Sequence, residues 1–329
     1  MLKHLLVTVA LAAMTTAATA ADFNPAIVYG TSGKFDKSFN EMAYTGAEKF
    51  KADTGSSYRD FEAQADSQAE QGIRNFASRG FSPVIVTNFG YKDQLAKVAK
   101  EFPDIDFVML DDVVDLPNVR SVTFKEEQGS YVIGLIAALS SKSKAVGFIG
   151  GMDIPIIRKF GCGYAQGASA GGATNIIRNM TGTTNAAFND PVKGGEIAAS
   201  QMGQGADVIF AAAGGTGIGV LQKVADSGKF AIGVDSNQNY MHPGVMLTSM
   251  VKRVDVAVYN ALKDAKEGQF TGGVQSLGLA ENGVDWALDE HNRSLITPEV
   301  EAAAKKAKDE IAAGTLKVHD YMSDDKCPV

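Results

Sequence analysis

The amino-acid sequence predicts an α/β protein built on two parallel sheets. Short apolar runs rich in β-branched residues alternate with longer amphipathic stretches, an order typical of strands joined by helices. The alternation forms two blocks, roughly 25–122 and 123–248, and each block has the size of one domain. No linker rich in Pro, Gly or Ser separates them. We therefore expect two doubly wound lobes that face each other across a cleft, where open α/β sheets bind ligands.

The first block alternates regularly along the chain. Gly55 and Gly80 follow its first two amphipathic stretches and are typical of helix ends. Pro83–Thr87 is a short β-branched run of the kind found in buried strands. The predicted strands cover 26–29, 58–62, 83–87 and 106–110, and the predicted helices cover 41–54, 67–78 and 91–101.

The second block repeats this architecture without a clear sequence repeat. Its predicted strands cover 145–149, 175–178, 208–212, 230–234 and 245–249, and its predicted helices cover 128–140, 159–171, 194–203, 218–227 and 254–266. A final helix is predicted over 298–313, with Pro298 at a starting position and Gly314 just past its end.

The first twenty residues differ from the rest. Lys3 gives a positive start, 5–14 is an apolar run too short to span a bilayer, and Ala18-Thr19-Ala20 offers small residues at a cleavage site. We expect residues 1–20 to be a signal peptide cut near Ala20, and the mature protein to be periplasmic. No Cys lies near the cut, so we expect no lipid anchor.

Charge and cysteine content narrow the function classes. A net charge of −7 gives little support to a nucleic-acid or anionic-membrane partner. The two cysteines, Cys162 and Cys327, can form one disulfide in an oxidising compartment, although two free thiols remain the alternative. No His and Cys residues stand at zinc-ligand spacing, so we expect no metal and no cofactor.

The loops that follow the predicted strands carry candidate binding residues. Aromatic rings, amides and carboxylates at one sheet edge suit a ring-bearing polyol, because a ring stacks on aromatic faces while hydroxyls bond to carboxylates. Ordinary turn chemistry is the alternative for any single loop. The candidates are Asp36, Phe39, Asn40, Asn88, Asp111, Gly214 and Asp235.

Three motifs resemble parts of catalytic or cofactor sites, but none of them has the sequence context that such a site requires. Gly167-Ala168-Ser169-Ala170-Gly171 has the nucleophile-elbow pattern, but it lies in a helical stretch and not between a strand and a helix. Glycines 215–219 precede Asp235 by about the distance of a dinucleotide site, but Val220 breaks the glycine register. Asp111 and Asp112 are adjacent, so their side chains should point to opposite faces.

Eight strings along the chain resemble the basic membrane protein family, the substrate-binding proteins of ABC importers, in which purine nucleoside receptors are the best-known members. Among these strings are FDKSFNEMAYTGAEKF, FNDPVKGGEIA, FAAAGGTGIGVLQ and LTSMVKRVDVAVYNAL, and they span essentially the whole mature chain in order. The resemblance implies the type I periplasmic-binding-protein fold, whose chain crosses three times between lobes. We place lobe one at 22–122 plus 250–276 and lobe two at 123–249 plus 277–329.

The resemblance also assigns roles to residues of this chain. It implies that Phe39 stacks on a base, that Asn40 hydrogen-bonds it and that Phe188 supplies a second aromatic from the other lobe. Asp235 and Lys252 would hold the sugar hydroxyls. The resemblance also implies ligand-facing positions at Asp111 and Gly214, whereas Asp36 and Asn88 are candidates from their loops alone.

One position departs from the family pattern. Gly30 stands where nucleoside receptors usually carry an Asp that contacts the base. A free base, a sugar or another small ring therefore remains an alternative ligand. We expect a monomeric, non-enzymatic protein that hands a nucleoside-like molecule to an ABC permease in the inner membrane. The alternatives are a signalling co-receptor with the same fold and a nucleoside hydrolase.

Overall fold

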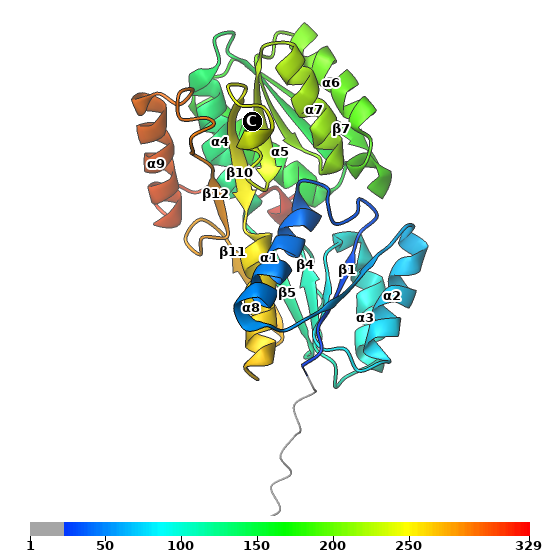
Figure 1. Ribbon diagram of the computed structural model, residues 1–329. Helices are drawn as coiled ribbons and strands as arrows, with labels where there is room; N and C mark the ends of the chain where they lie inside the picture. Colours follow the sequence, from blue (N-terminus) through cyan, green and yellow to red (C-terminus); the bar gives the residue numbers. More distant parts are fainter. Residues whose placement is uncertain (1–22) are drawn as a thin grey trace, which may run out of the picture.

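The computed structural model describes residues 23–329, and the expected signal peptide at 1–20 lies outside this range. The chain forms two lobes, each built on one twisted sheet with helices on both faces (Figure 1). We call them lobe one, which contains the N-terminal strands, and lobe two, which contains the central part of the chain. This arrangement confirms the predicted fold class.

Lobe one is built on a sheet whose strands are all parallel, in the order β11-β5-β4-β3-β1-β2. The strands are β1 (Ala26–Tyr29), β2 (Arg59–Glu62), β3 (Val84–Val86), β4 (Phe107–Leu110), β5 (Val119–Phe124) and β11 (Gly273–Leu277). The helices are α1 (Phe39–Thr54), α2 (Ala69–Ala77), α3 (Lys92–Glu101) and α8 (Val254–Lys266).

Lobe two has the sheet order β12-β10-β9-β8-β6-β7, in which only the edge strand β12 is antiparallel to its neighbour. Its strands are β6 (Ala145–Met152), β7 (Asn175–Gly182), β8 (Val208–Ala212), β9 (Phe230–Asp235), β10 (Met246–Lys252) and β12 (Val284–Trp286). Its helices are α4 (Glu126–Ser140), α5 (Pro155–Ala170), α6 (Pro191–Gly203), α7 (Gly215–Asp226) and α9 (Pro298–Ala312).

Alternate residues of each central strand pack against different helix layers. In β1, Ile27 and Tyr29 join the core cluster that contains α1 and α8, whereas Ala26 and Val28 join the cluster that contains α2 and α3. All four side chains are fully buried. Both faces of the sheet are therefore covered, which explains why the strand is apolar throughout and does not alternate with polar residues.

The described chain crosses between the lobes at three places. It passes from β5 to α4 through Lys125, from β10 to α8 through Arg253, and from β11 to β12. The crossings are tied together, because Lys125 N donates to Leu277 O at 2.9 Å and Arg253 N donates to Gly283 O at 2.9 Å. Strands β5 and β10 run two and three residues beyond the expected boundaries at 122 and 249.

Helices α4 and α5 approach each other closely through glycines. A Cβ on Gly167 would lie 1.9 Å from the carbonyl oxygen of Tyr131, and one on Gly134 would lie 2.1 Å from that of Tyr164. Gly167 therefore belongs to a helix contact and not to a strand-to-helix turn, so residues 167–171 are not a nucleophile elbow. This tight contact joins the two helices into one packed unit of lobe two.

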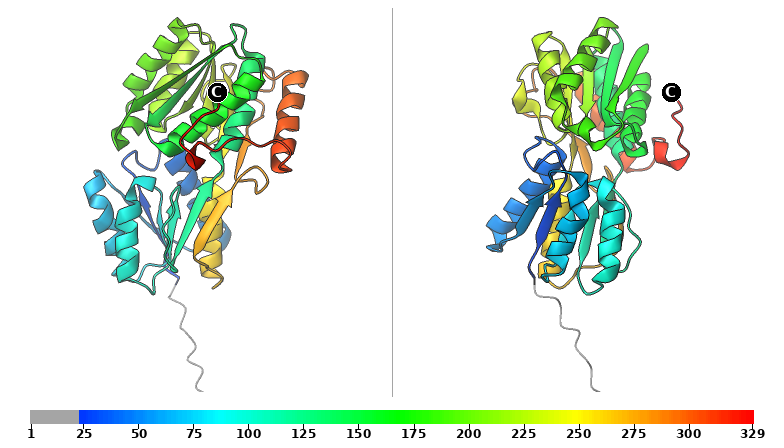
Figure 2. Two further views of the ribbon diagram at one scale, coloured as in Figure 1. Left: turned by 180° about the vertical axis from the view of Figure 1, so that it is seen from behind. Right: turned by 90° about the vertical axis from the view of Figure 1, so that its right-hand side faces the viewer.

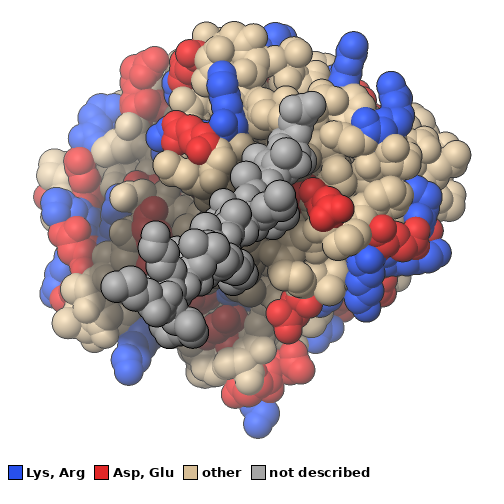
Figure 3. All heavy atoms as spheres, turned by 90° about the horizontal axis from the view of Figure 1, so that it is seen from below, with Lys and Arg blue, Asp and Glu red and all other residues tan. Residues whose placement is uncertain are grey.

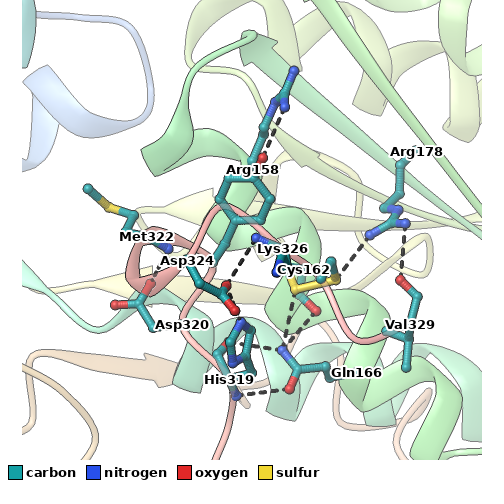
Figure 4. The surroundings of a disulfide bond; sticks show 12 residues. Arg158, Cys162, Gln166, Arg178, His319, Asp320, Met322, Asp324, Lys326 and Val329 are labelled. Atoms are coloured by element: carbon teal, nitrogen blue, oxygen red, sulfur yellow. Dashed lines mark hydrogen bonds and ion pairs between the residues drawn. A yellow bond between two sulfur atoms is a disulfide. The ribbon is translucent and has the colours of Figure 1, made fainter.

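The C-terminal tail lies against lobe two (Figure 2). The structure joins Cys162 of α5 to Cys327, with Cα atoms 5.6 Å apart. Gln166 accepts the backbone N–H of His319 through Oε1 at 2.9 Å and donates through Nε2 to the His319 carbonyl at 3.0 Å. Arg178 of β7 donates to the main-chain oxygen of Val329 at 3.2 Å (Figure 4).

Several elements differ from the sequence prediction. Helices α5 and α6 begin at Pro155 and Pro191, four and three residues earlier than predicted, because Pro is suited to the first position of a helix. Strand β7 continues to Gly182, beyond the predicted end at 178. The prediction also lacked β5, β11 and β12, three of the four strands that flank the crossings.

The face at the free end of lobe one mixes charges of both signs (Figure 3). Seen from the end of lobe one, Lys and Arg side chains are interspersed with Asp and Glu (Figure 3). Within residues 23–329 no helix is long and apolar enough to cross a membrane.

Candidate ligand-binding cavity

A cavity, partly open to solvent, is lined by the carboxyl ends of strands from both sheets. All nine residues predicted from the sequence to face a ligand line this one cavity: Asp36, Phe39, Asn40, Asn88, Asp111, Phe188, Gly214, Asp235 and Lys252. Whether they contact a ligand stays a prediction.

Sheet order divides the lining into two ends. Asp111, Asp235 and Lys252 stand at the ends of β4, β9 and β10, near the crossings, and we call this the hinge end. Gly30, Asn88, Phe89, Phe188 and Gly214 follow strands further from the crossings, and we call this the outer end.

The loop before α1 is organised by Asp36. Its Oδ1 accepts the backbone N–H groups of Ser38 at 2.8 Å and Glu41 at 3.1 Å, and its Oδ2 accepts that of Asn40 at 3.1 Å. Burial raises the pKa of Asp36 to about 6, while these three hydrogen bonds act against the increase. Asp36 therefore caps the helix and fixes the position of Phe39. Each of its carboxylate oxygens already accepts at least one hydrogen bond from the protein.

Asn40 is also tied into the protein. Its Nδ2 donates to the Gly33 carbonyl at 3.0 Å and its Oδ1 accepts from the hydroxyl of Thr87 at 2.8 Å. One N–H and one lone pair of the amide remain for a ligand.

Asp111 and Lys252 form a buried ion pair between the lobes. Lys252 Nζ lies 2.5 Å from Asp111 Oδ2, and the lysine side chain is 1% exposed. The second carboxylate oxygen, Asp111 Oδ1, is buried and has no hydrogen-bond partner within the described residues. Asp111 has φ +64°, a left-handed conformation that Asp tolerates better than most residues. Its neighbour Asp112 pairs instead with Lys92 at the surface, at 2.8 Å.

The ammonium group of Lys252 is surrounded by further partners. It lies 2.8 Å from Glu126 Oε1, and 5.0 and 4.8 Å from the ring centres of Phe39 and Phe124. Burial alone would lower the pKa of Lys252, but Asp111, Glu126 and Asp235 outweigh it and raise the pKa above its ordinary value. Lys252 is therefore charged at neutral pH.

A second buried lysine continues this chain of charges into lobe two. Lys159 of α5 lies 3.0 Å from Glu126 and 3.3 Å from Glu127. The two lysines face four buried carboxyl groups, those of Asp111, Glu126, Glu127 and Asp235. Burial raises the pKa values of Asp111 and Glu127 to about 7 against the pull of the lysines. The hinge end is thus rich in acceptors.

Asp235 connects the same region to the loop before α1. Its Oδ2 accepts from the buried hydroxyl of Ser38, a contact between the two lobes. Burial raises the pKa of Asp235, although Lys252 and Ser38 act to lower it. Like Asp111, Asp235 ends a strand with a left-handed backbone, at φ +63°.

Other contacts join the lobes around the cavity. Gln238 Nε2 and Ser236 Oγ of lobe two donate to the Lys37 carbonyl of lobe one at 2.8 and 2.7 Å. Asn185 of lobe two donates to Asp66 of lobe one at 2.9 Å. The structure therefore represents a form in which the lobes touch.

The remaining walls are mainly apolar, with the hydroxyl residues Ser32 and Thr87 among them. Phe188 packs edge-on against Phe89 of the opposite lobe, with ring centres 6.0 Å apart. Ile156, Ile157 and Phe160, all from the first turns of α5, complete the lining. The sequence prediction lacked these three residues: with the helix start placed at 159, Ile156 and Ile157 fell in an unassigned loop and Phe160 lay inside a helix.

Two facing α/β lobes, a cleft at their strand ends, and a cavity with aromatic walls and buried acceptors define a two-lobed solute-binding protein. Comparison with known proteins narrows this class. Residues 26–318 match the family of PnrA-like ABC transporter substrate-binding proteins. The chain belongs to this family.

Two curated relatives span most of the chain. The "ABC transporter nucleoside-binding protein BmpA" of Lactococcus lactis is 32% identical over 321 residues, covering 90% of this chain and 89% of the relative. "Basic membrane protein D" of Borreliella burgdorferi is 30% identical over 300 residues, covering 88% and 86%. A solute-binding protein of an ABC transporter system from Aeropyrum pernix K1 has a similar structure, with a TM-score of 0.82, 26% identity, and 89% and 92% coverage.

Proposed function

We propose that this protein captures a nucleoside between its lobes and delivers it to an ABC importer. The observation that carries this proposal is Asp111 Oδ1, a buried carboxylate oxygen without a partner among the described residues, at the wall of a cavity with aromatic sides. A buried acceptor of this kind favours a ligand that brings a hydroxyl or N–H donor. A sugar joined to an aromatic base supplies both required chemistries.

The two ends of the cavity suit the two parts of a nucleoside. At the hinge end, Asp111 and Asp235 would accept hydrogen bonds from ribose hydroxyls, and Lys252 would hold both carboxylates in place. Phe39 of lobe one, next to Lys252, and Phe188 of lobe two, at the outer end, would contact the faces of the base. Because these residues come from both lobes, the ligand would stabilise the closed form.

The relatives support the transport role and the ligand class. A relative over most of the chain is named a nucleoside-binding protein, and the family as a whole serves ABC transporters. We further propose that the chain is exported and that cleavage near Ala20 releases it. An intact mass that retained residues 1–20 in the exported protein would contradict this.

Titration calorimetry on the purified protein tests the ligand class. The panel should contain nucleosides, their free bases and ribose, and nucleosides should bind most tightly because only they reach both ends. Each nucleoside should be recovered unchanged after long incubation, which separates binding from hydrolysis. If no nucleoside or base binds, the ligand assignment is wrong, while membership of the family stands.

A further inference from the structure

The outer end of the cavity contains an amide whose orientation is fixed by the main chain. Asn88 Oδ1 accepts the backbone N–H of Gly90 at 2.8 Å, in a turn directly after β3. The oxygen is therefore occupied by the protein. The amide nitrogen, Nδ2, donates no hydrogen bond within residues 23–329, and Asn88 lines the cavity. This side chain thus has N–H groups available for a ligand.

Gly30 leaves the space that Asn88 fills. A Cβ on Gly30 would lie 2.6 Å from Asn88 Nδ2 and 3.2 Å from Asn88 Cβ, so a side chain there would push the amide away. The backbone of Gly30 does not need glycine for its conformation, because its φ lies outside the left-handed region. The glycine is explained by the room that it gives to the amide.

Two further polar groups lie at the outer end: the backbone N–H of Gly214 and the hydroxyl of Ser32, which can donate or accept. Gly214 lines the cavity at the start of α7, and its backbone N–H has no acceptor within the described residues. The cavity carboxylates are engaged by the protein or lie elsewhere: Asp36 accepts three backbone N–H groups, and Asp111 and Asp235 stand at the hinge end. A ligand edge that meets the outer end therefore meets N–H groups and no free carboxylate.

We propose that Asn88 determines base specificity by selecting bases that present a carbonyl oxygen at this edge over bases that present an amino group. This inference rests on the proposed nucleoside function. The carbonyl oxygen of inosine or uridine accepts from Asn88 Nδ2, whereas the amino group of adenosine or cytidine brings a second donor to the same place. Two opposed donors in a desolvated site both lose a partner.

The exchange Asn88→Asp tests this with almost no change of shape. One carboxylate oxygen keeps the hydrogen bond from Gly90, while the other replaces the amide nitrogen and can only accept. The wild type should bind inosine about 10-fold or more tightly than adenosine, and uridine more tightly than cytidine. Asn88→Asp should reverse both rankings. Comparing two nucleosides with the same ribose within each variant cancels any general loss of affinity.

Two further variants separate recognition from the structural role of Asn88 in its turn. Asn88→Ala removes both the turn contact and the donor, and should abolish the preference without reversing it. Gly30→Ala keeps Asn88 but displaces its amide, and should have the same effect. A purely structural role would make Asn88→Asp behave like the wild type and only Asn88→Ala differ.

The outcomes distinguish this inference from the proposed function. If nucleosides bind but the inosine-to-adenosine ratio stays unchanged in Asn88→Asp, Asn88→Ala and Gly30→Ala, Asn88 does not read the base. If Asn88→Asp binds neither nucleoside, the inosine-to-adenosine ratios of Asn88→Ala and Gly30→Ala decide whether Asn88 reads the base. If the wild type binds no nucleoside at all, the proposed function is wrong. The ligand would then have to be a carbonyl-bearing ring of another class.

Discussion

The hinge end of the cavity holds Asp111, Asp235 and Lys252 in contacts with other protein groups, whereas the outer end presents aromatic rings and N–H groups. The hinge end also belongs to the crossings, because Lys252 and Glu126 flank two of them. Under the proposed function, the hinge end would serve both folding and ligand binding, whereas the outer end would mainly serve the ligand. Substitutions at the two ends should differ in kind: stability and binding should both change at the hinge end, but only binding at the outer end.

The largest effect should follow the exchange Lys252→Met. It leaves Asp111, Glu126 and Asp235 buried without their shared cation, and breaking a buried pair in this way costs about 3–5 kcal/mol of unfolding free energy. Urea unfolding measures this loss. Lys92→Met is a matched control, because Lys92 pairs with the next residue, Asp112, at the surface, where such pairs contribute about 0–1 kcal/mol. Equal losses in the two variants would contradict the structural role of the hinge end.

The next effect should follow Asp235→Asn, which removes the charge but keeps a residue that tolerates φ +63°. Losing a buried charged acceptor costs about 2–5 kcal/mol of binding free energy for a nucleoside. A free base lacks the hydroxyls and should bind nearly as before. Calorimetry with both ligands checks this, with Asp112→Asn as the control of equal charge change. Equal weakening of nucleoside and base would refute the assignment of Asp235 to the sugar.

At the outer end, Phe188→Ala should weaken nucleosides and free bases to the same degree. A stacking aromatic contributes about 1–3 kcal/mol per base, so affinity should fall about 10- to 100-fold. Unlike Lys252→Met, this variant should leave the hinge-end charges unchanged. Phe35→Ala, which alters an exposed ring outside the cavity lining, should bind as the wild type does. A selective loss of ribosides in Phe188→Ala would contradict the division of the cavity.

The last effect concerns the dependence of stability on pH. Because burial raises the pKa of Asp111 to about 7, the folded protein holds this proton over a pH range in which the unfolded chain has released it. The contribution of Asp111 to stability is thus full below about pH 4 and decreases as pH rises toward 7, by at most about 1.4 kcal/mol per pH unit. Asp111→Asn should flatten the stability profile of the ligand-free protein between pH 5 and 7. An unchanged profile would show that Asp111 does not titrate there.

Much of this architecture could be predicted from the sequence, and the misses have physical reasons. The apolar runs at β1, β3, β4, β8 and β9 predicted the sheets, and their following loops predicted the cavity residues, because parallel strands share one carboxyl edge. Pro155 and Pro191 begin their helices as Pro298 does, and only Pro298 was used to predict a helix start. The same rule would have predicted the starts of α5 and α6, and with them the lining residues Ile156 and Phe160.

Other features could not be predicted from local sequence patterns, because they depend on segments that meet only in the folded chain. Asp36 was predicted to face the ligand, and it does line the cavity, but its hydrogen bonds from three backbone N–H groups depend on the folded path of the loop. The pairing of Lys159 with Glu126 and Glu127 joins segments that are distant in sequence, and nothing in their spacing indicates it. Strand β11 is short and largely exposed, and its place is set by pairing with β5.

The place of β11 has a consequence for the order in which the chain can mature on the ribosome. Five strands of the first sheet are complete once Phe124 has been synthesised, but the sixth lies at Gly273–Leu277. Until that segment emerges, β5 is an edge strand with unpaired backbone groups, which other chains could use as a template. Lobe two must be translated in between, so the nascent chain spends that interval with an incomplete first sheet, vulnerable to aggregation and suited to chaperones that hold it unfolded.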